Sequence, residues 1–109
     1  MSGASTPPPP PMTHPVMSAA QGMLLVLNAA SLRRLPMPFA AKAYDYSPIV
    51  DLQFSSRVDV VTWAAALDIA ELLDEESVHA AGVYDQTLFE AVWHDVPIRC
   101  VCSVPRSPR

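Results

Sequence analysis

The only two cysteines, Cys100 and Cys102, are separated by one residue in the stretch IRCVCSV. Paired thiolates occur in metal sites and redox centres. Residues two apart on a strand lie about 6.8 Å apart, however, which is the upper limit for a disulfide. Both side chains would point to one apolar face, where a free cysteine behaves as a small hydrophobic residue. We predict two core thiols. The alternative is a small metal-binding or redox protein that uses Cys100, Cys102 and a nearby histidine.

An acidic run stands close to one histidine. Asp74, Glu75 and Glu76 precede His79. Carboxylates with an imidazole could hold a divalent cation or form an acid and base pair. A cation site needs convergent ligands, whereas consecutive loop residues point in different directions, so we predict a hydrated acidic loop.

A second histidine, His94, lies four residues after Glu90 on an expected strand, with Arg99 on the facing strand. Residues four apart on a strand share a face. A histidine and carboxylate pair of this kind could serve general acid–base catalysis. Because no nucleophile accompanies the pair, we predict a polar surface cluster and no catalytic residue.

Other motifs that carry chemistry are missing from the sequence. Gly3, Gly22 and Gly82 are too far apart to form a phosphate-binding loop, and no zinc-protease, hydrolase or Cys-x-x-Cys motif occurs. The formal net charge is -4 and the seven basic residues are scattered, which argues against nucleic acid because phosphate binding needs clustered Lys and Arg. We expect a non-enzymatic protein with no cofactor-binding or metal residues.

The chain carries no clear signal for export or membrane insertion. Met23 to Leu27 are apolar, but no Lys or Arg precedes them. The run is too short for a signal-peptide core or for the roughly 20 apolar residues of a membrane span. Two cysteines are also too few for a disulfide framework. We expect a cytoplasmic protein without membrane contact.

Composition divides the chain into three parts. Residues 1–17 include the proline run Pro7 to Pro11. Ligands of proline-recognition domains usually carry a basic residue beside the prolines, and none is present here, so we predict a disordered tail. Residues 18–104 are apolar enough to fold as a single α+β domain. Residues 105–109 are expected to be a flexible C-terminus.

Helical spacing and capping residues predict two helices. The first begins at Ser18, where Gln21 completes a capping box, and stops before the prolines that follow Leu35. The second begins at Ser55 or Ser56 and ends near Leu73. Its expected buried stripe comprises Val58, Val61, Ala65, Ile69 and Leu72, flanked by Trp63, Ala64 and Leu67. Residues 77–82 would form a loop.

Alternation of apolar and polar residues predicts two hairpins. The first joins strands 39–44 and 49–54 through a four-residue loop, 45–48. Its register pairs Ala43 with Val50, Ala41 with Leu52, Lys42 with Asp51, Tyr44 with Ile49, Ala40 with Gln53 and Phe39 with Phe54. The second spans residues 83–104 with loop 94–97. Its register pairs Trp93 with Ile98, Ala91 with Cys100, Phe89 with Cys102 and Thr87 with Val104. The fold class that follows is α+β with the order α-β-β-α-β-β: a four-stranded antiparallel sheet with two helices packed on one face.

Three short motifs give the chain a family likeness. They are Leu35-Pro36-Met37-Pro38, Trp63-Ala64-Ala65-Ala66-Leu67 and Val96-Pro97-Ile98. In these the chain resembles a group of small uncharacterised α+β proteins encoded by high-GC Gram-positive bacteria and their mobile elements. The likeness covers roughly residues 30–104, and such proteins often have glycine where this chain has Asp95. It implies a fold and no activity.

Exposed aromatic residues provide the remaining functional expectation. Tyr44, Tyr46 and Pro48 stand near the tip of the first hairpin, and exposed aromatic side chains favour interfaces. A small core and open sheet edges also favour contact with a partner. We therefore expect a protein–protein interaction or self-association module with an accessory role in a larger assembly.

Overall fold

The computed structural model describes residues 18–106, so the predicted tail and residues 107–109 lie outside the described part. Two helices and five strands follow in the order α-β-β-α-β-β-β, which confirms the α+β class with one strand more than predicted. The elements are α1 (Ala19–Leu32), β1 (Ala40–Tyr44), β2 (Ser47–Phe54), α2 (Arg57–Ala66), β3 (Leu73–His79), β4 (Gly82–Trp93) and β5 (Val96–Pro105).

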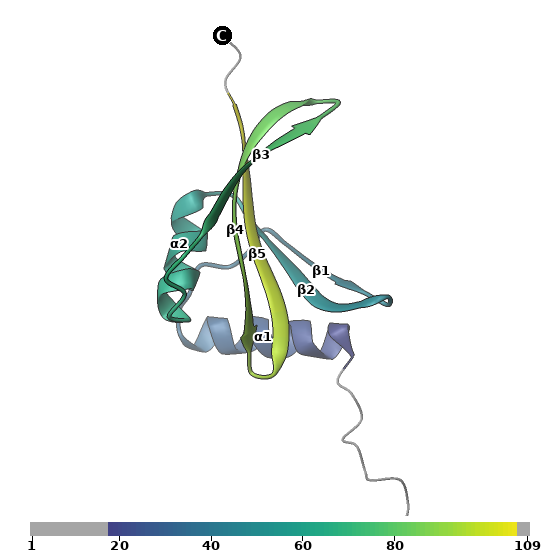
Figure 1. The fold of residues 1–109 in the computed structure, drawn as a ribbon. Helices are drawn as coiled ribbons and strands as arrows, with labels where there is room; N and C mark the ends of the chain where they lie inside the picture. Colours follow the sequence, from purple (N-terminus) through teal and green to yellow (C-terminus); the bar gives the residue numbers. More distant parts are fainter. Residues whose placement is uncertain (1–17, 107–109) are drawn as a thin grey trace, which may run out of the picture.

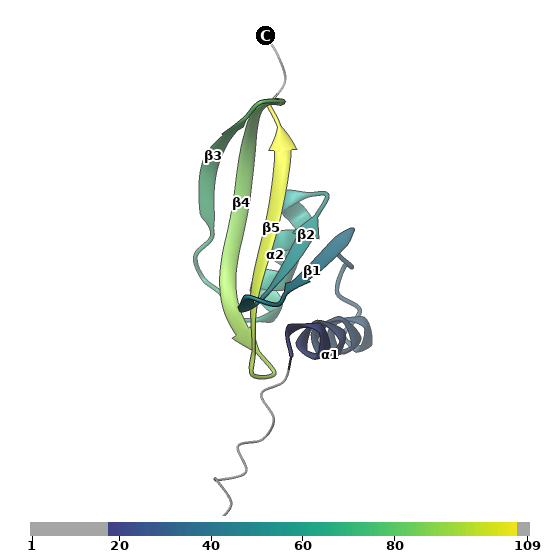
Figure 2. The same ribbon diagram turned by 90° about the vertical axis from the view of Figure 1, so that its right-hand side faces the viewer.

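The five strands form one mixed sheet in the spatial order β1-β2-β5-β4-β3, which runs from right to left in Figure 2. Neighbouring strands are antiparallel except β2 and β5, which run parallel at the centre. The prediction of four antiparallel strands was therefore wrong in number and in direction. Parallel pairing between strands far apart in sequence leaves no local signature, because it depends on a long crossover and not on a turn.

The additional strand is β3, in a segment predicted to be the end of a helix followed by a loop. Acidic residues have a low strand propensity, yet β3 pairs with β4 along its whole length, from Leu73 opposite Leu88 to His79 opposite Gly82. At the turn, Gly82 has a φ of +139°, a conformation that other residues rarely adopt. Pairing with β4 therefore overrides the weak local preference.

Both helices pack on the same face of the sheet, as predicted. In Figure 1, α2 lies beside the sheet and α1 runs below the hairpin of β1 and β2, and their buried side chains share one core with β2, β4 and β5. That core consists of Val26, Ala30, Val50, Leu52, Phe54, Val60, Trp63, Ala64, Phe89, Val96, Ile98, Cys100 and Cys102.

Trp63 links the helices to the sheet. Its ring is fully buried, 5.4 Å from the ring of Phe54 and 5.7 Å from that of Trp93, both edge to face. Its indole Nε1 donates a 2.7 Å hydrogen bond to the carbonyl of Pro36. One side chain on α2 thus contacts β2, β4 and the segment that leaves α1.

Both ends of α1 are closed by capping motifs. The predicted capping box is confirmed, because Ser18 accepts from the Gln21 amide and Gln21 accepts from the Ser18 amide. At the other end of α1, Arg34 has a φ of 58° and the Leu35 amide donates to the Ala30 carbonyl. This is a Schellman ending, in which glycine usually occupies the left-handed position.

Helix α2 is shorter than predicted and rotated. It begins after the N-cap Ser56 but ends at Ala66, not near Leu73, because Asp68 (φ 58°) forms a second Schellman ending in which Ile69 donates to Ala64. The buried face comprises Val60, Trp63 and Ala64. Most of the predicted stripe was therefore placed on the wrong side: Val58, Val61 and Ala65 are exposed, while Ile69 and Leu72 pack against the core from the loop.

The first hairpin has the predicted register over most of its length. Ala40 pairs with Gln53, Ala41 with Leu52 and Lys42 with Asp51. A bulge between Lys42 and Tyr44 then pairs Tyr44 with Ser47 instead of Ile49. The loop is therefore two residues long and not four, and the strand β2 starts earlier than predicted.

The second hairpin is shifted by two residues from its predicted register. Trp93 pairs with Val96, Ala91 with Ile98, Phe89 with Cys100 and Thr87 with Cys102. Its turn consists of His94 and Asp95, both with positive φ, as a two-residue type I′ turn requires. An even shift keeps every side chain on its predicted face because the side-chain period of a strand is two. Strand β5 also continues to Pro105, one residue beyond the predicted domain.

Candidate interaction surface

One face of the sheet carries no helix from residues 18–106. In Figure 2, α2 lies behind the sheet, so the face of β4 and β5 turned to the viewer is uncovered. Two apolar residues on it are largely solvent-exposed, Val92 at 71 % and Leu73 at 57 %. We call this surface the open face. Its members alternate with core residues along the strands and include Lys42, Ile49, Asp51, Gln53, Leu73, Leu88, Glu90, Val92, Pro97, Arg99, Val101 and Ser103.

Four charged residues line up across the open face. Lys42 of β1 stands opposite Asp51 of β2, which in turn stands beside Arg99 of β5. Arg99 is also the partner of Glu90 on β4. The signs therefore alternate across four neighbouring strands, and we call these residues the charge row.

The outer charges of this row are more open to solvent than the inner ones. Lys42 and Glu90 are exposed, and Asp51 and Arg99 are half-buried. Within residues 18–106, the ion pairs shorter than 4.0 Å all involve other residues. Neighbouring opposite charges on adjacent strands attract one another, but this geometry also leaves each of them able to bind a group above the sheet.

The predicted tyrosine patch borders the charge row. The rings of Tyr44 and Tyr46 lie 5.1 Å apart, and Tyr46 is 84 % exposed. A shallow hollow is lined by both tyrosines together with Ile49 and by Asp51, Glu90 and Arg99 of the charge row. Pro48 lines a second hollow, of about 390 Å³, next to the first turn of α1. The two tyrosines are therefore continuous with the open face, whereas Pro48 lies beside the first turn of α1.

Arg99 lies at the centre of the open face. Its side chain lines three hollows, one toward Tyr44, one toward Phe39 and one toward Leu73. A guanidinium group offers five N–H donors in a planar fork that fits a carboxylate, and arginine is enriched at interfaces. Arg99 is consequently the group in this surface best suited to bind a carboxylate of a partner.

Cys100 and Cys102 are core thiols, as predicted. Their side chains are 0 % and 1 % exposed, and both are free cysteines. Burial raises the pKa of the Cys100 thiol far above its usual range. Burial, with a smaller effect from the charge of Asp59, also raises the pKa of Cys102. Both thiols therefore stay protonated at neutral pH, the form that is neither nucleophilic nor a good metal ligand.

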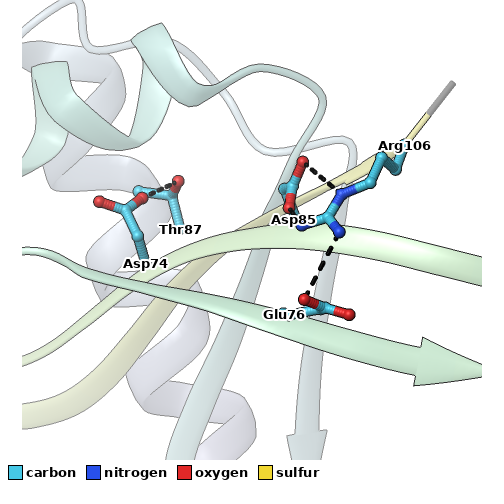
Figure 3. Close-up of polar contacts among 5 residues, drawn as sticks. All are labelled: Asp74, Glu76, Asp85, Thr87 and Arg106. Carbon is cyan, nitrogen blue, oxygen red and sulfur yellow. Dashed lines mark hydrogen bonds and ion pairs between the residues drawn. The ribbon is translucent and has the colours of Figure 1, made fainter.

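The acidic run is part of β3 and not a loop, and its residues point to alternate faces. Asp74 accepts a 2.7 Å hydrogen bond from the Thr87 hydroxyl, and Glu76 and Asp85 both bind Arg106, at 3.4 and 2.6 Å (Figure 3). The hydrogen bond from Thr87, followed by the contact with Arg57, lowers the pKa of Asp74. These carboxylates hold β3 and the end of β5 in place.

The two candidate histidine sites do not assemble. His94 lies in the turn after β4, and its ring is tilted by 43° against that of Trp93, with the centroids 5.0 Å apart. The prediction that His94 shares a strand face with Glu90 was therefore wrong. His79 accepts or donates a 2.7 Å hydrogen bond with Ser77. Across residues 18–106, no three His, Cys, Asp or Glu side chains gather in a way that could hold a metal ion.

The charge row was only partly visible in the sequence. The pair Lys42 and Asp51 was predicted, and Glu90 and Arg99 were placed near each other on a second hairpin. What joins the two pairs is the parallel contact of β2 with β5, and no residue pattern indicates it. The one signal that could have suggested this parallel contact is a pair of opposite charges, Asp51 in the middle of β2 and Arg99 in the middle of β5.

Comparisons of the chain with protein-family models, with curated proteins and with solved structures give no match. The likeness to small proteins of high-GC Gram-positive bacteria thus stays an expectation drawn from short motifs. Neither helix within residues 18–106 is long and apolar enough to cross a membrane.

Proposed function

We propose that this protein is a non-enzymatic interaction module that binds a protein partner through the open face. The observation that carries the proposal is a sheet face that no helix of the described residues covers, and that combines exposed apolar residues, two adjacent tyrosines and an arginine that lines three hollows. Interfaces are enriched in tyrosine and arginine, and both are common among the few residues that contribute most of the binding energy. An accessory role in a larger assembly fits such a module.

The composition of the open face favours a protein over other partners. Its charged residues carry both signs, so it has no basic patch of the kind that binds phosphate backbones. Exposed Val92 and Leu73 supply apolar contact area, and the charge row can fix the orientation of a bound partner. The metal or redox alternative receives no support from Cys100 and Cys102, since both thiols are buried and protonated.

The test is site-specific photo-crosslinking in the cells that produce the protein. A photoreactive amino acid is placed at Val92 on the open face and, as a matched control, at Val58 on the solvent side of α2. Both side chains are 71 % exposed, so random collisions should label them equally. We expect a discrete protein adduct from position 92 and none from position 58.

Two outcomes would contradict the proposal. Absence of an adduct from position 92 would mean that the open face has no protein partner in the cell. Equal adducts from both positions would mean that the labelling reports random contact and not a specific surface.

A further inference from the structure

We propose that the partner of the open face is a second copy of the same chain, packed sheet on sheet around a two-fold axis parallel to the strands. The axis runs between β2 and β5, the two central strands of the charge row. This inference rests on the proposed function of the open face and names its partner. It follows from the symmetry of the charge row.

An alternating row with an even number of charges is complementary to its own reversal. From β1 to β4 the signs read plus, minus, plus, minus, and in the opposite direction they read minus, plus, minus, plus. A two-fold axis along the strands reverses the row of the second copy. Asp51 then faces Arg99 of the second copy, and Lys42 faces Glu90. A two-fold axis parallel to the row would instead place each charged residue opposite the same residue of the second copy, so that like charges would meet.

The residues beside the row are compatible with the same axis. Val92 of β4 pairs with Pro97 of β5. Ile49 of β2 lies on the other side of Pro97, because the next residues along these two parallel strands, Val50 and Ile98, are partners. Reversal places Ile49 on Pro97 of the second copy, which is an apolar contact on one side of the row, and Gln53 on Val101 on the other side. Isologous interfaces require this kind of self-complementarity, and aligned sheets pack face to face in this way.

The two groups of residues have different roles in such a dimer. Removing charged groups from water offsets much of their mutual attraction, so ion pairs select an arrangement more than they strengthen it. The apolar residues supply the driving force. With this axis the two copies overlap across the four strands β1, β2, β5 and β4, which span about 15 Å between the outer strands, and this is small for a permanent interface. We expect a reversible dimer with a dissociation constant on the order of micromolar, weakened by salt.

The test uses two single charge reversals, Arg99→Asp and Asp51→Arg. Each variant alone places like charges opposite each other at the dimer axis, so its association should weaken at least tenfold. In the first variant positions 51 and 99 are both acidic, and in the second both are basic. An equimolar mixture therefore brings acidic positions of one chain onto basic positions of the other. Sedimentation velocity should show monomers for each variant and a restored dimer for the mixture.

The mixture separates contact between chains from contact within a chain. Residues 51 and 99 are also neighbours inside one sheet, and in both variants this internal pair carries like charges. Mixing leaves the internal pair unchanged, so only contact between chains can restore the dimer. Circular dichroism of each variant checks that it is folded. Arg57→Asp and Asp68→Arg, which make the same changes of charge on α2 and after it, should leave the wild-type dimer intact.

Each remaining outcome contradicts part of the proposal. A wild-type chain that stays monomeric throughout the micromolar range rules out the second copy. If position 92 still gives an adduct in the cell, the open face binds a different protein and the proposed function stands. A wild-type dimer that neither reversal weakens uses another surface, and reversals that weaken it without rescue on mixing mean that the axis is wrong.

Discussion

The chemical behaviour of individual side chains in this molecule depends on their position relative to the core. Cys100 and Cys102 lie inside it, where burial suppresses the thiolate. Asp74 lies at the exposed edge of the sheet, where a hydrogen bond from Thr87 stabilises the carboxylate. Burial therefore raises the pKa of the two thiols and keeps them in the unreactive protonated form, whereas the hydrogen bond lowers the pKa of Asp74 and keeps it ionised.

A thiol reagent should not modify the folded protein. Both cysteines are buried and protonated, so the reagent cannot reach the sulfur atoms and the reactive thiolate does not form. Mass spectrometry after a short pulse of N-ethylmaleimide should detect no adduct under native conditions and modification of both cysteines in denaturant. Rapid modification of the native chain would mean that the faces of β5 are inverted.

Thr87→Val should raise the pKa of Asp74 toward its ordinary value of 3.8. A carboxylate whose pKa is lowered in the folded state stabilises that state above the unfolded pKa, and this stabilisation is lost as the pH falls through the folded pKa. The variant should therefore begin to unfold at a higher pH during acid titration. An NMR titration of the Asp74 carboxyl measures the shift directly.

Ser77→Ala is the matched control, because Ser77 lies on β3 like Asp74 but its hydroxyl is hydrogen-bonded to His79. It should leave the pKa of Asp74 unchanged. If Thr87→Val also leaves it unchanged, the main cause of the shift is the second contact, with Arg57, and Arg57→Ala should then raise it.

At the scale of elements, both helices end with a residue other than glycine in the left-handed conformation. Arg34 and Asp68 have φ angles of 58°, and the following amide closes each Schellman motif. Left-handed backbone costs about 1–2 kcal/mol for most residues and little for glycine. Asp68 also places a negative charge at the negative end of the dipole of α2.

Asp68→Gly should therefore raise the free energy of unfolding by about 1 kcal/mol. Ala65→Gly, within the last turn of the same helix, is the control and should lower it by about 1 kcal/mol, because glycine in a helix interior loses more backbone entropy. Urea denaturation of the three proteins measures both changes. A loss of stability in Asp68→Gly would mean that the aspartate has a favourable contact that its geometry does not reveal.

Local patterns predicted the elements better than their pairing. The capping box at Ser18 and the faces of both hairpins were correct, because capping chemistry and a side-chain period of two depend on neighbouring residues. Helix α2 was predicted too long since Ile69 and Leu72 continue the apolar spacing, although they reach the core from a loop. β3 was missed because its strand conformation comes from β4 and not from its own residues.

At the scale of the whole molecule, Trp63 stabilises the junction between the two helices and the sheet. Trp63→Ala should lower the free energy of unfolding by about 3–5 kcal/mol, because it removes a large buried ring and leaves a cavity. Trp63→Phe keeps most of the ring but removes the hydrogen bond to the Pro36 carbonyl, and should cost about 1–2 kcal/mol. Thermal or chemical denaturation measures both. Equal losses would place the main contribution in the indole N–H.

The candidate site depends on whole-molecule topology, which explains why it was predicted only in parts. Tyr44, Tyr46 and Pro48 were chosen because they are close in sequence. The charge row joins two hairpins that are separated by α2, and only the parallel pairing of β2 with β5 brings them together. Surfaces assembled from distant segments in this way leave no short motif.

The central position of β5 also has a consequence for the synthesis of the protein. β5 is made after the four strands that it holds together, so the nascent chain first contains two separate hairpins, β1–β2 and β3–β4, each lacking the neighbour that completes it. Contacts between distant segments form slowly, and unpaired strand edges promote aggregation. Each newly made chain must therefore pass through an interval in which its sheet is in two pieces, and that interval ends only when the segment containing the two cysteines leaves the ribosome.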